Sequence, residues 1–347
     1  MEEVELYSFS ELKTYMRCPK RYEYSRLHNL EKIGINVPAD KGNWFHTLMM
    51  EDLLGNDWEQ IHRDMVAEFD TSIGILTDDE DILSIPEDAY RMFQGYKAKY
   101  PDHFSRWKVL HVEESMSFEL FPGVHIGFTP DLVAEDEYGG IWAWDHKTTQ
   151  TIPQPGEMLV DLQNLTYSLG LRKLYGSRFK GFVFNYVRSK PPTMPKLRKD
   201  GLVSDVRRVD TTFDMLREFM IVNGIPRYPE LNDRLAYLST HDNFFKRDYF
   251  VVPDEALQRI FEELTGWVAK IRADTEMFNN FQDGVTTSPF SFGRVILPKH
   301  AGTAGCHRCP MVDICQADLL GIPRESILLD YQERTPLGRT YIPITEV

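Results

Sequence analysis

The four cysteines of the chain constrain its fold more than any other feature, because they lie near its two ends. Three of them form a C-x2-C-x5-C pattern, and the fourth lies almost three hundred residues earlier; they are Cys18, Cys306, Cys309 and Cys315. This distribution predicts four ligands of one metal centre. Such a centre closes a very long loop, which on the chain-entropy model stabilises the fold by roughly 5–6 kcal/mol. We therefore expect it to be structural.

The length and composition are those of a globular protein with a sizeable core. The chain has 347 residues, and no apolar run approaches the ~20 residues of a membrane helix. Its acidic first residues lack the basic start of a signal peptide. We therefore expect a cytoplasmic protein, in which clustered cysteines favour a metal over disulfides. For a cytosolic C-x2-C pattern, the residues alone favour zinc.

The charge is distributed unevenly along the chain. The formal net charge is −14, which argues against a nucleic-acid partner, but residues 172–208 carry eleven Lys or Arg and only two acids. Residues 51–90 carry thirteen acids and one base. Because local fields decide where a polyanion binds, the basic segment is compatible with DNA binding. A solvated loop balanced by an acidic helical region explains the pattern equally well.

Periodicity divides the chain into a helical start and an α/β core. Period-3.6 patterns predict helices over 8–27, 41–54, 58–69 and 86–100. Period-2 patterns then predict a three-stranded meander over 110–120, 124–128 and 141–147, followed by a helix over 155–174 and a strand over 181–187. This order predicts an α/β fold with a central mixed sheet flanked by helices.

The second half is less regular. Pro191, Pro192 and Pro195 predict that residues 189–208, here called the basic arm, form a loop. We expect helices over 213–223, 230–239 and 254–272 and a strand over 244–252. The expected segments are a helical lobe (1–105), a core (106–188), a basic arm with helical insertion (189–252), a C-terminal helix with a cysteine loop (253–321), and a tail of unassigned role (322–347).

Two aspartates and a lysine form the candidate catalytic group. Asp145 and Lys147 are two apart on a predicted strand and therefore share one face, while Trp142 and Trp144 pack behind. Asp131, at the end of the preceding strand, can meet them across the hairpin. Converging carboxylates next to a lysine are costly without a divalent cation, and oxygen ligands suit Mg²⁺ or Mn²⁺. This chemistry predicts hydrolysis of a phosphodiester.

Other polar residues near this group are less specific. His46 lies on a predicted helix with buried apolar neighbours, and such a histidine is more often a core or surface residue than a ligand. Gln163 and Tyr167 are four apart and share a helix face, which is also the pattern of an ordinary polar flank. One of Glu113 and Glu114 could support the metal ligands, but for Glu113 we expect a solvent-facing side chain.

Taken together, these motifs resemble the RecB-type branch of the PD-(D/E)XK nucleases, in particular the iron–sulphur nucleases of the CRISPR-associated, AddB-type and exonuclease V groups and their stand-alone phage versions. Six elements in this order carry the resemblance: Cys18-Pro19, Gly42…His46, Gly127-x3-Asp131, Asp145-His-Lys147-Thr148, Gln163-x3-Tyr167 and Cys306-x2-Cys309-x5-Cys315. They span most of the chain. The basic arm and the helices after it lie outside the pattern.

The resemblance implies a restriction-endonuclease-like core and a role for each motif. His46, Asp131, Asp145 and the backbone carbonyl of His146 would bind Mg²⁺ or Mn²⁺, and Lys147 would be the catalytic lysine. Gln163 and Tyr167 would bind DNA and support the site. The four cysteines would bind a [4Fe–4S] cluster, with zinc as the less favoured alternative.

The resulting hypothesis is a metal-dependent exonuclease that degrades single-stranded DNA ends in replication, recombination or repair. The basic arm would contact backbone phosphates through Arg188, Lys190, Lys196, Arg198 and Lys199. One alternative is a catalytically silent DNA-binding or recombination scaffold on the same fold, and another is a zinc-containing adaptor for a partner protein. No Walker-type motif occurs, so a separate helicase or recombination protein is an expected partner. A phage-encoded chain would act in the host cytoplasm.

Overall fold

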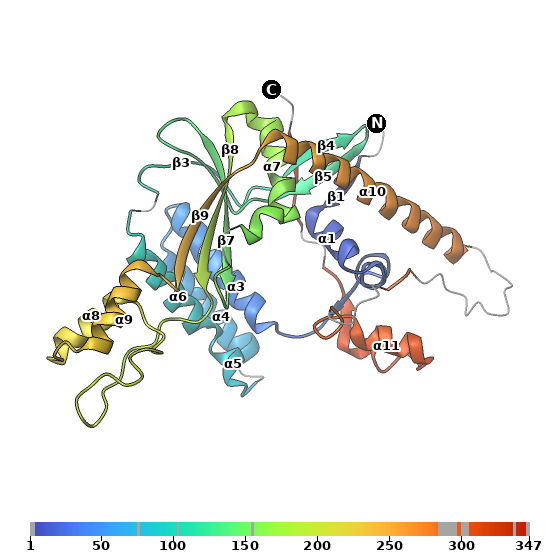
Figure 1. Ribbon diagram of the computed structural model, residues 1–347. Helices are drawn as coiled ribbons and strands as arrows, with labels where there is room; N and C mark the ends of the chain where they lie inside the picture. Colours follow the sequence, from blue (N-terminus) through green and yellow to red (C-terminus); the bar gives the residue numbers. More distant parts are fainter. Residues whose placement is uncertain are drawn as a thin grey trace.

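A five-stranded mixed sheet forms the centre of the molecule (Figure 1). The computed structural model describes residues 4–74, 77–102, 104–153, 156–283, 297–299, 305–335 and 338–344. The strands of this sheet, in spatial order, are β3 (Lys108–Val112), β6 (Leu132–Glu135), β7 (Ile141–Thr149), β8 (Phe179–Arg188) and β9 (Phe245–Val251). Strands β7 and β8 are parallel, and the other neighbours are antiparallel.

Strand β8 is buried along most of its length, which explains its nearly continuous apolar sequence, whereas β7 is apolar in its first half and polar from Asp145 onward. Helix α7 (Leu162–Tyr175) connects β7 to β8 and allows them to run parallel. The register pairs Asp145 with Phe184 and Lys147 with Tyr186. Because Phe184 and Tyr186 are 1% exposed, the charged end of β7 lies against a rigid apolar strand. The mixed α/β architecture agrees with a restriction-endonuclease-like fold.

A second sheet packs beside the first. Its four strands, in spatial order, are β1 (Glu5–Ser8), β5 (Val124–Phe128), β4 (Met116–Phe121) and β11 (Ile342–Pro343). The largest apolar core lies between this sheet, α7 and the long helix α10 (Asp254–Asp283), with Phe118, Ile126 and Val268 fully buried. At Gly170, an added Cβ would lie 2.6 Å from the Phe128 ring. Glycine therefore lets α7 approach this sheet closely.

The prediction of one strand over 110–120 and of a three-stranded meander is wrong in a way that matters for the site. The chain forms two strands here, β3 and β4, which belong to different sheets. They are separated at Glu113, whose φ of 48° is unusual for a non-glycine residue. The chain crosses between the sheets again at Asp131, between β5 and the unpredicted strand β6. Glu113 and Asp131 therefore occupy the two crossings.

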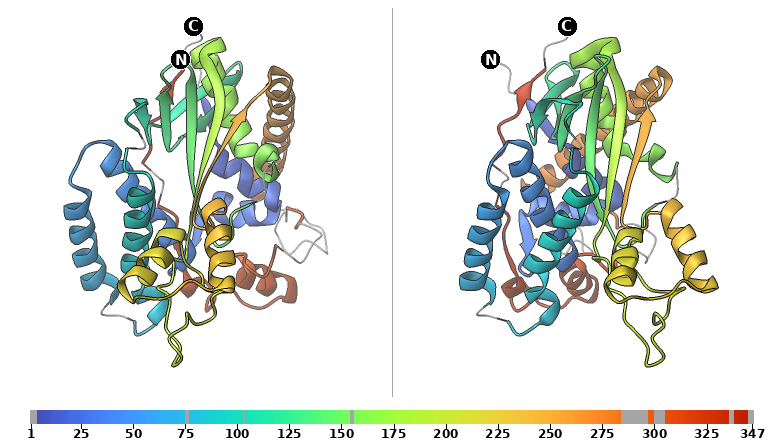
Figure 2. Two further views of the ribbon diagram at one scale, coloured as in Figure 1. Left: turned by 60° about the vertical axis from the view of Figure 1, so that its left-hand side comes forward. Right: turned by 90° about the vertical axis from the view of Figure 1, so that its left-hand side faces the viewer.

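Helices cover both faces of the five-stranded sheet (Figure 2). On one face lie α3 (Val37–Leu53), α4 (Trp58–Phe69), α5 (Glu80–Leu83) and α6 (Ile85–Lys99). Phe45, Phe93 and Tyr96 are buried in this layer together with Phe245 of β9. On the other face lie α1 (Phe9–Arg17), α7 and α10, which contact one another. The sheet is thus enclosed between two helical layers.

The predicted helix over 8–27 is interrupted at the first cysteine. Ser8 caps α1 as expected, since its hydroxyl accepts from the Glu11 N–H at 3.3 Å. The chain then becomes extended at Cys18, with φ −168°, before α2 (Pro19–Tyr22) and a π-helical turn over Glu23–Leu27. Because a proline restricts the residue before it to extended conformations, Pro19 explains this break.

Two further regions extend from the core. Strand β8 continues into the basic arm, whose bridge Leu197–Val203 is isolated, and then into α8 (Phe213–Val222) and α9 (Pro229–Thr240) at the lower left of Figure 1. These two helices have a small core of their own that contains Leu216, Leu231 and Leu235. The predicted helices and the loop are confirmed here.

The C-terminal part contributes to distant elements rather than forming an independent unit. Helix α11 (Val312–Leu320) is followed by β10 (Tyr331–Glu333), which pairs with β2 (Leu30–Lys32), and by β11, which pairs with β4. The tail, for which the sequence predicts no role, therefore adds a strand to each of two sheets. Within the described parts of the chain, no helix combines the length and the apolarity needed to cross a membrane.

Candidate functional site

A close approach of helix α3 to strand β7 places His46. A Cβ added to Gly42 would lie 2.8 Å from the Thr148 Oγ1 atom, immediately after Lys147 in β7. Only glycine allows this helix–strand distance without a shift. His46 follows four residues later on the same face of α3, while Leu48 and Met49 are buried in the helical layer. The glycine–histidine spacing thus directs the imidazole toward the end of β7.

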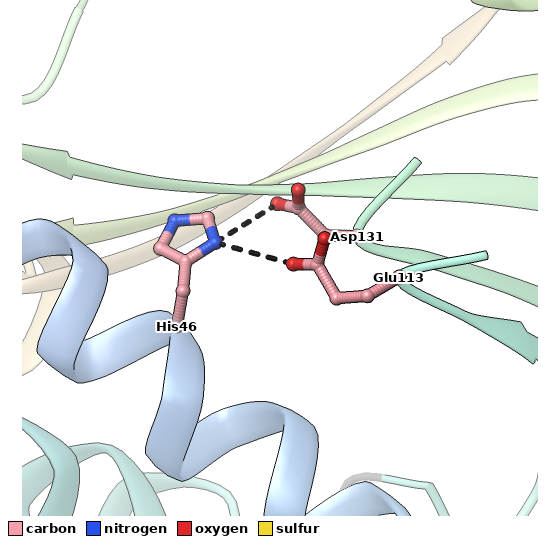
Figure 3. A group of neighbouring side chains, drawn as sticks. All are labelled: His46, Glu113 and Asp131. Atoms are coloured by element: carbon pink, nitrogen blue, oxygen red, sulfur yellow. Dashed lines mark ion pairs between the residues drawn. The ribbon is translucent and has the colours of Figure 1, made fainter. Parts of the chain in front are cut away.

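The two sheet crossings place two carboxylates beside this imidazole. The His46 Nδ1 atom lies 3.6 Å from the Asp131 Oδ2 atom and 3.8 Å from the Glu113 Oε1 atom (Figure 3). The Glu113 backbone N–H donates to the Asp131 carbonyl at 3.1 Å, which fixes the two crossings side by side. Ligand atoms of the three residues lie within 4.8 Å of one another.

Glu113 is therefore a site residue that the sequence did not identify. We expected a solvent-facing side chain, but 28% of it is exposed and its carboxylate points at His46 (Figure 3). The alternating pattern of residues 110–120 hides the sheet crossing, because alternation continues on both sides of it. No motif signal marks this glutamate.

The catalytic strand supplies the other half of the site. The Lys147 Nζ atom lies 2.8 Å from the Asp145 Oδ2 atom, and both side chains are on one face of β7 as predicted. The His146 backbone N–H donates to the Asp131 Oδ2 atom at 2.6 Å. This hydrogen bond links the carboxylate at the sheet crossing to the strand that carries Asp145. The structure thus brings His46, Asp131, Asp145 and Lys147 together; with Glu113, we call this group the acidic site.

The charged side chains of the acidic site lie close enough to shift the pKa values of one another. Burial raises the pKa of Asp131, the charge of His46 opposes this, and the carboxylates of Asp145 and Glu113 add to the rise, so that the value is about 7. Burial lowers the pKa of His46, but the carboxylates of Asp131 and Glu113 outweigh it and raise the value to about 9. A divalent cation bound here would replace the protons and neutralise the carboxylates.

Helix α7 places two further predicted residues beside the carboxylates. The Gln163 Nε2 atom donates to the Tyr167 hydroxyl at 3.3 Å. Burial raises the pKa of Tyr167, and the charges of Asp145 and Asp131 raise it further, which places the hydroxyl near both. Asp161 caps α7 by accepting from the Gln163 N–H at 2.8 Å. The predicted glutamine–tyrosine pair therefore borders the acidic site.

Lys13 of helix α1 is a second lysine near the site, and sequence reasoning did not single it out. Burial lowers its pKa, and the charge of Lys147 lowers it further. The charges of Asp161 and Asp145 oppose this. A lysine on an amphipathic helix far from the motifs gives no signal in the sequence.

Behind the catalytic strand, a chain of buried polar groups orients His146. The Asn185 Nδ2 atom donates to the His146 Nδ1 atom at 2.8 Å, and both residues are at most 2% exposed. The Arg247 Nε atom donates to the Asn185 Oδ1 atom at 3.3 Å, and its guanidinium stacks 3.7 Å from the centre of the Tyr100 ring. The chain holds the strand segment whose backbone binds Asp131.

The four predicted cysteines line one cavity of about 210 Å³ together with Tyr24 and Leu319. Cys18 lies at the break between α1 and α2, and Cys315 lies on α11. The Cys309 N–H donates to the Cys306 carbonyl at 3.0 Å, which forms a tight turn between these two residues. The cysteines form no disulfide, and burial raises the pKa of the Cys309 and Cys315 thiols. We call this group the cysteine cavity.

The predicted DNA-binding residues of the basic arm begin near the acidic site and extend away from it. The Ser189 N–H donates to the Thr149 carbonyl at 2.8 Å, so the arm starts beside the end of β7. Arg188 pairs with Asp210 and Arg198 pairs with Asp200. Lys190, Lys196 and Lys199 are exposed. The aromatic residues at the start of the arm are buried in the core and do not offer stacking surfaces for bases; they are Tyr186, Phe244 and Phe245.

The chain belongs to the PD-(D/E)XK nuclease superfamily, because the model of that family matches residues 7–316. This match includes both the acidic site and all four cysteines. It confirms the resemblance at the level of the superfamily and defines the chemistry as that of a metal-dependent nuclease acting on DNA. No curated protein sequence matches the chain.

Proposed function

We propose that the protein is a Mg²⁺- or Mn²⁺-dependent exonuclease that degrades single-stranded DNA ends in replication, recombination or repair. The observation that carries this proposal is the convergence of His46, Glu113, Asp131 and Asp145 next to Lys147 from four separate parts of the chain. One imidazole and three carboxylates are a hard donor set that suits these cations. The raised pKa values of Asp131 and His46 fit a site that requires a cation.

The roles of the side chains follow from their positions. His46, Asp131, Asp145 and the backbone carbonyl of His146 are the proposed ligands, and we add Glu113 as a ligand or as an acceptor for a bound water. A bound cation would polarise the scissile phosphate and lower the pKa of its water. Lys147 remains protonated, since the charges of Asp145 and Asp131 keep its pKa raised despite burial. Its ammonium group orients the attacking water and offsets charge on the phosphate.

Gln163 and Tyr167 are proposed to position the DNA strand over the acidic site. Their hydrogen bond presents a polar edge of α7 to the carboxylates, and the tyrosine hydroxyl can donate to a phosphate oxygen. The exposed lysines of the basic arm would contact the same strand farther along by charge alone. Contacts of this kind do not read sequence and weaken steeply with salt.

For the cysteine cavity, we propose a [4Fe–4S] cluster that joins the chain ends. All four cysteines belong to the described residues, and no three of their thiols lie within 4.8 Å of one another. Thiolates around a single Zn²⁺, at ~2.3 Å from the ion, lie about 3.8 Å apart. A cluster binds each thiolate through a different iron and therefore spaces them more widely. A wider spacing is compatible with a cluster, and the resemblance of the cysteine pattern favours iron–sulphur over zinc.

The test is digestion of end-labelled linear DNA and of circular single-stranded DNA by anaerobically purified protein with Mg²⁺ and with Mn²⁺. We expect a brown protein that degrades linear single strands and spares circles. Rapid cutting of circles would show an endonuclease. DNA binding without any cleavage under either metal would instead identify the silent scaffold, and a colourless, zinc-containing protein would remove the cluster.

A further inference from the structure

A cavity of about 500 Å³ lies next to the cysteine cavity and is lined by arginines from both ends of the chain. Arg21 and Arg26 come from the helical turns after Cys18, and Arg334 follows strand β10. Met311 and Arg21 line both cavities. The pairing of β10 with β2 brings Arg334 to the N-terminal residues. We call these three residues and the space between them the arginine cavity.

The arginines carry more positive charge than their surroundings neutralise. The Nε atoms of Arg21 and Arg26 are buried, and no acceptor among the described residues binds them. Burial lowers the pKa of Arg26, and the neighbouring charges of Arg334 and Arg21 lower it further against the single opposing carboxylate of Glu11. An uncompensated group of this kind is costly to the fold, so an anion is the missing partner.

The acids around the cavity offset only part of the charge of the arginines. Asp40 is occupied at the start of α3, where its Oδ2 atom accepts from the Asn36 N–H at 2.9 Å. Glu11 accepts from the Tyr22 hydroxyl at 3.0 Å. Glu31 is exposed on β2, and Lys32 pairs with Asp313 at 2.5 Å. The carboxylate of Glu11 also acts on Arg26 and Arg334 and offsets part of the charge of the three arginines, while two buried guanidinium N–H groups have no acceptor among the described residues.

The cavity is close to the acidic site along helix α3. Asn36 and Asp40 line it, and His46 lies six to ten residues further along the helix, which corresponds to about 9–15 Å. Thr14 also lines the cavity, and its neighbour Lys13 is near Lys147 and Asp145. A nucleic-acid strand can therefore reach the arginine cavity within a few nucleotides of the acidic site.

We propose that Arg21, Arg26 and Arg334 form a phosphate-binding pocket for the DNA strand whose scissile bond lies at the acidic site. Guanidinium groups suit this ligand, because their planar N–H forks bind phosphate oxygens in pairs. The proposal rests on the proposed nuclease function and names a substrate contact remote from the chemistry. Since Arg334 follows the cysteine loop in the chain, the pocket is complete only when the two chain ends are held together.

The test uses the full-length variants Arg26→Ala and Arg334→Ala, the charge-preserving Arg26→Lys, and Arg259→Ala on the exposed face of α10 as a matched control. Binding of a fluorescent single-stranded oligonucleotide is measured by anisotropy without divalent metal. We expect roughly tenfold weaker binding for each alanine variant, as for loss of a charge-assisted hydrogen bond. The salt slope should fall by about 0.7 for each lost phosphate contact. Arg26→Lys should recover part of the affinity, and Arg259→Ala should bind like the wild type.

Thermal unfolding separates a ligand site from a structural role. The alanine variants relieve repulsion between arginines, so their Tm should be unchanged or higher, and stabilisation by the oligonucleotide should be lost. A large fall in Tm without ligand would show that the arginines are structural and overturn the proposal. Wild-type affinity and salt slope in both alanine variants would overturn it as well.

Two further experiments test which phosphate compound the pocket binds and, separately, whether the protein is a nuclease. If inorganic phosphate or a deoxynucleoside monophosphate stabilises the wild type while the variants keep full oligonucleotide affinity, the pocket takes free phosphate compounds and the strand assignment is wrong. Hydrolysis of bis(p-nitrophenyl) phosphate, a diester too small to span both sites, should be equal in all variants. Absence of this hydrolysis in the wild type would contradict the nuclease proposal, whereas the binding comparison would still decide the pocket.

Discussion

The acidic site and the cysteine cavity are both built from distant parts of the chain, but the structure holds them together differently. Strand pairing, the Gly42 contact and the hydrogen bond from His146 to Asp131 position the acidic site. The cysteine cavity joins the break between α1 and α2 to α11, and a small core beside it contains Tyr24 and Ile314.

This difference assigns the two regions separate tasks. The acidic site holds several carboxylates close together, which is unfavourable for folding but is common where the charges are needed for chemistry. The cysteine cavity instead lies between segments from the two ends of the chain. Removing a ligand should therefore affect activity in the first region and stability in the second.

The largest expected effect is on catalysis. Lys147→Ala should lower the rate of DNA hydrolysis by about 10³-fold or more, because it removes electrostatic stabilisation of the transition state. Tm should change little, since the lysine pairs only with Asp145 at this site. Cleavage and thermal unfolding are measured on the same preparation. Undiminished Mg²⁺-dependent degradation would remove the catalytic assignment.

Cys18→Ala, in contrast, should mainly reduce the stability of the protein. Loss of one thiolate should release the metal centre and lower the free energy of unfolding by several kcal/mol, up to roughly the 5–6 kcal/mol of loop closure. Solubility and iron content should fall together. Iron content is measured with the denaturation midpoint, and Ser25→Ala on the neighbouring turn is a matched control. Retained iron with an unchanged midpoint would contradict a structural role for this cysteine.

Glu113→Gln tests whether Glu113 belongs to the acidic site. The substitution keeps the size of the side chain but removes a charge 3.8 Å from the His46 Nδ1 atom. We expect the half-saturating Mn²⁺ concentration to rise by about 10–100-fold, as for loss of a partner of a metal site. The maximal rate should fall less. The neighbouring Glu114→Gln is the control, and equal metal requirements in both variants would show that Glu113 lies outside the site.

The raised pKa values of the acidic site predict a pH dependence of stability without metal. Asp131 titrates near pH 7 when folded rather than at 3.8, and His46 near pH 9 rather than at 6.5. The folded state therefore binds more protons than the unfolded state between these values. The free energy of unfolding should fall as the pH rises toward 9 in the presence of EDTA. Asp131→Asn should flatten this profile, and a wild-type profile that rises over the same range would be inconsistent with the charge crowding.

Asn185→Leu should produce the smallest effect. Asn185 is not itself a proposed ligand, but its side chain binds the imidazole of His146, whose backbone N–H donates to Asp131. We expect about a tenfold rise in the half-saturating metal concentration, with partial rescue in Asn185→Asp. Metal titration of activity measures it. If Asn185→Leu changes only Tm and leaves the metal requirement as in the wild type, the residue is structural.

The sequence predicted the convergence of the candidate catalytic residues better than the strand order around them. Asp145 and Lys147 share a face because a strand has a period of two, and this holds wherever the strand lies. His46 required the family resemblance, since nothing local distinguishes it from a buried histidine. The break at Cys18 was visible in Pro19, which disfavours a helical residue before it.

Other features depend on long-range contacts that local patterns do not contain. The sheet crossing at Glu113 rests on one backbone angle in the left-handed region, which glutamate rarely adopts. Strand β11 has two residues and pairs with β4 more than two hundred residues away. Arg21, Arg26 and Arg334 form a cavity only after the ends of the chain have come together.

The most direct test of the account is a crystal structure with Mn²⁺ and an anomalous difference map. We predict an anomalous peak bonded to His46, Asp131 and Asp145, with Glu113 bonded to the ion or to its water and the Lys147 ammonium group nearby. A fully occupied Mn²⁺ elsewhere, with these side chains unchanged and no density between them, would contradict the assignment of the acidic site as the nuclease centre.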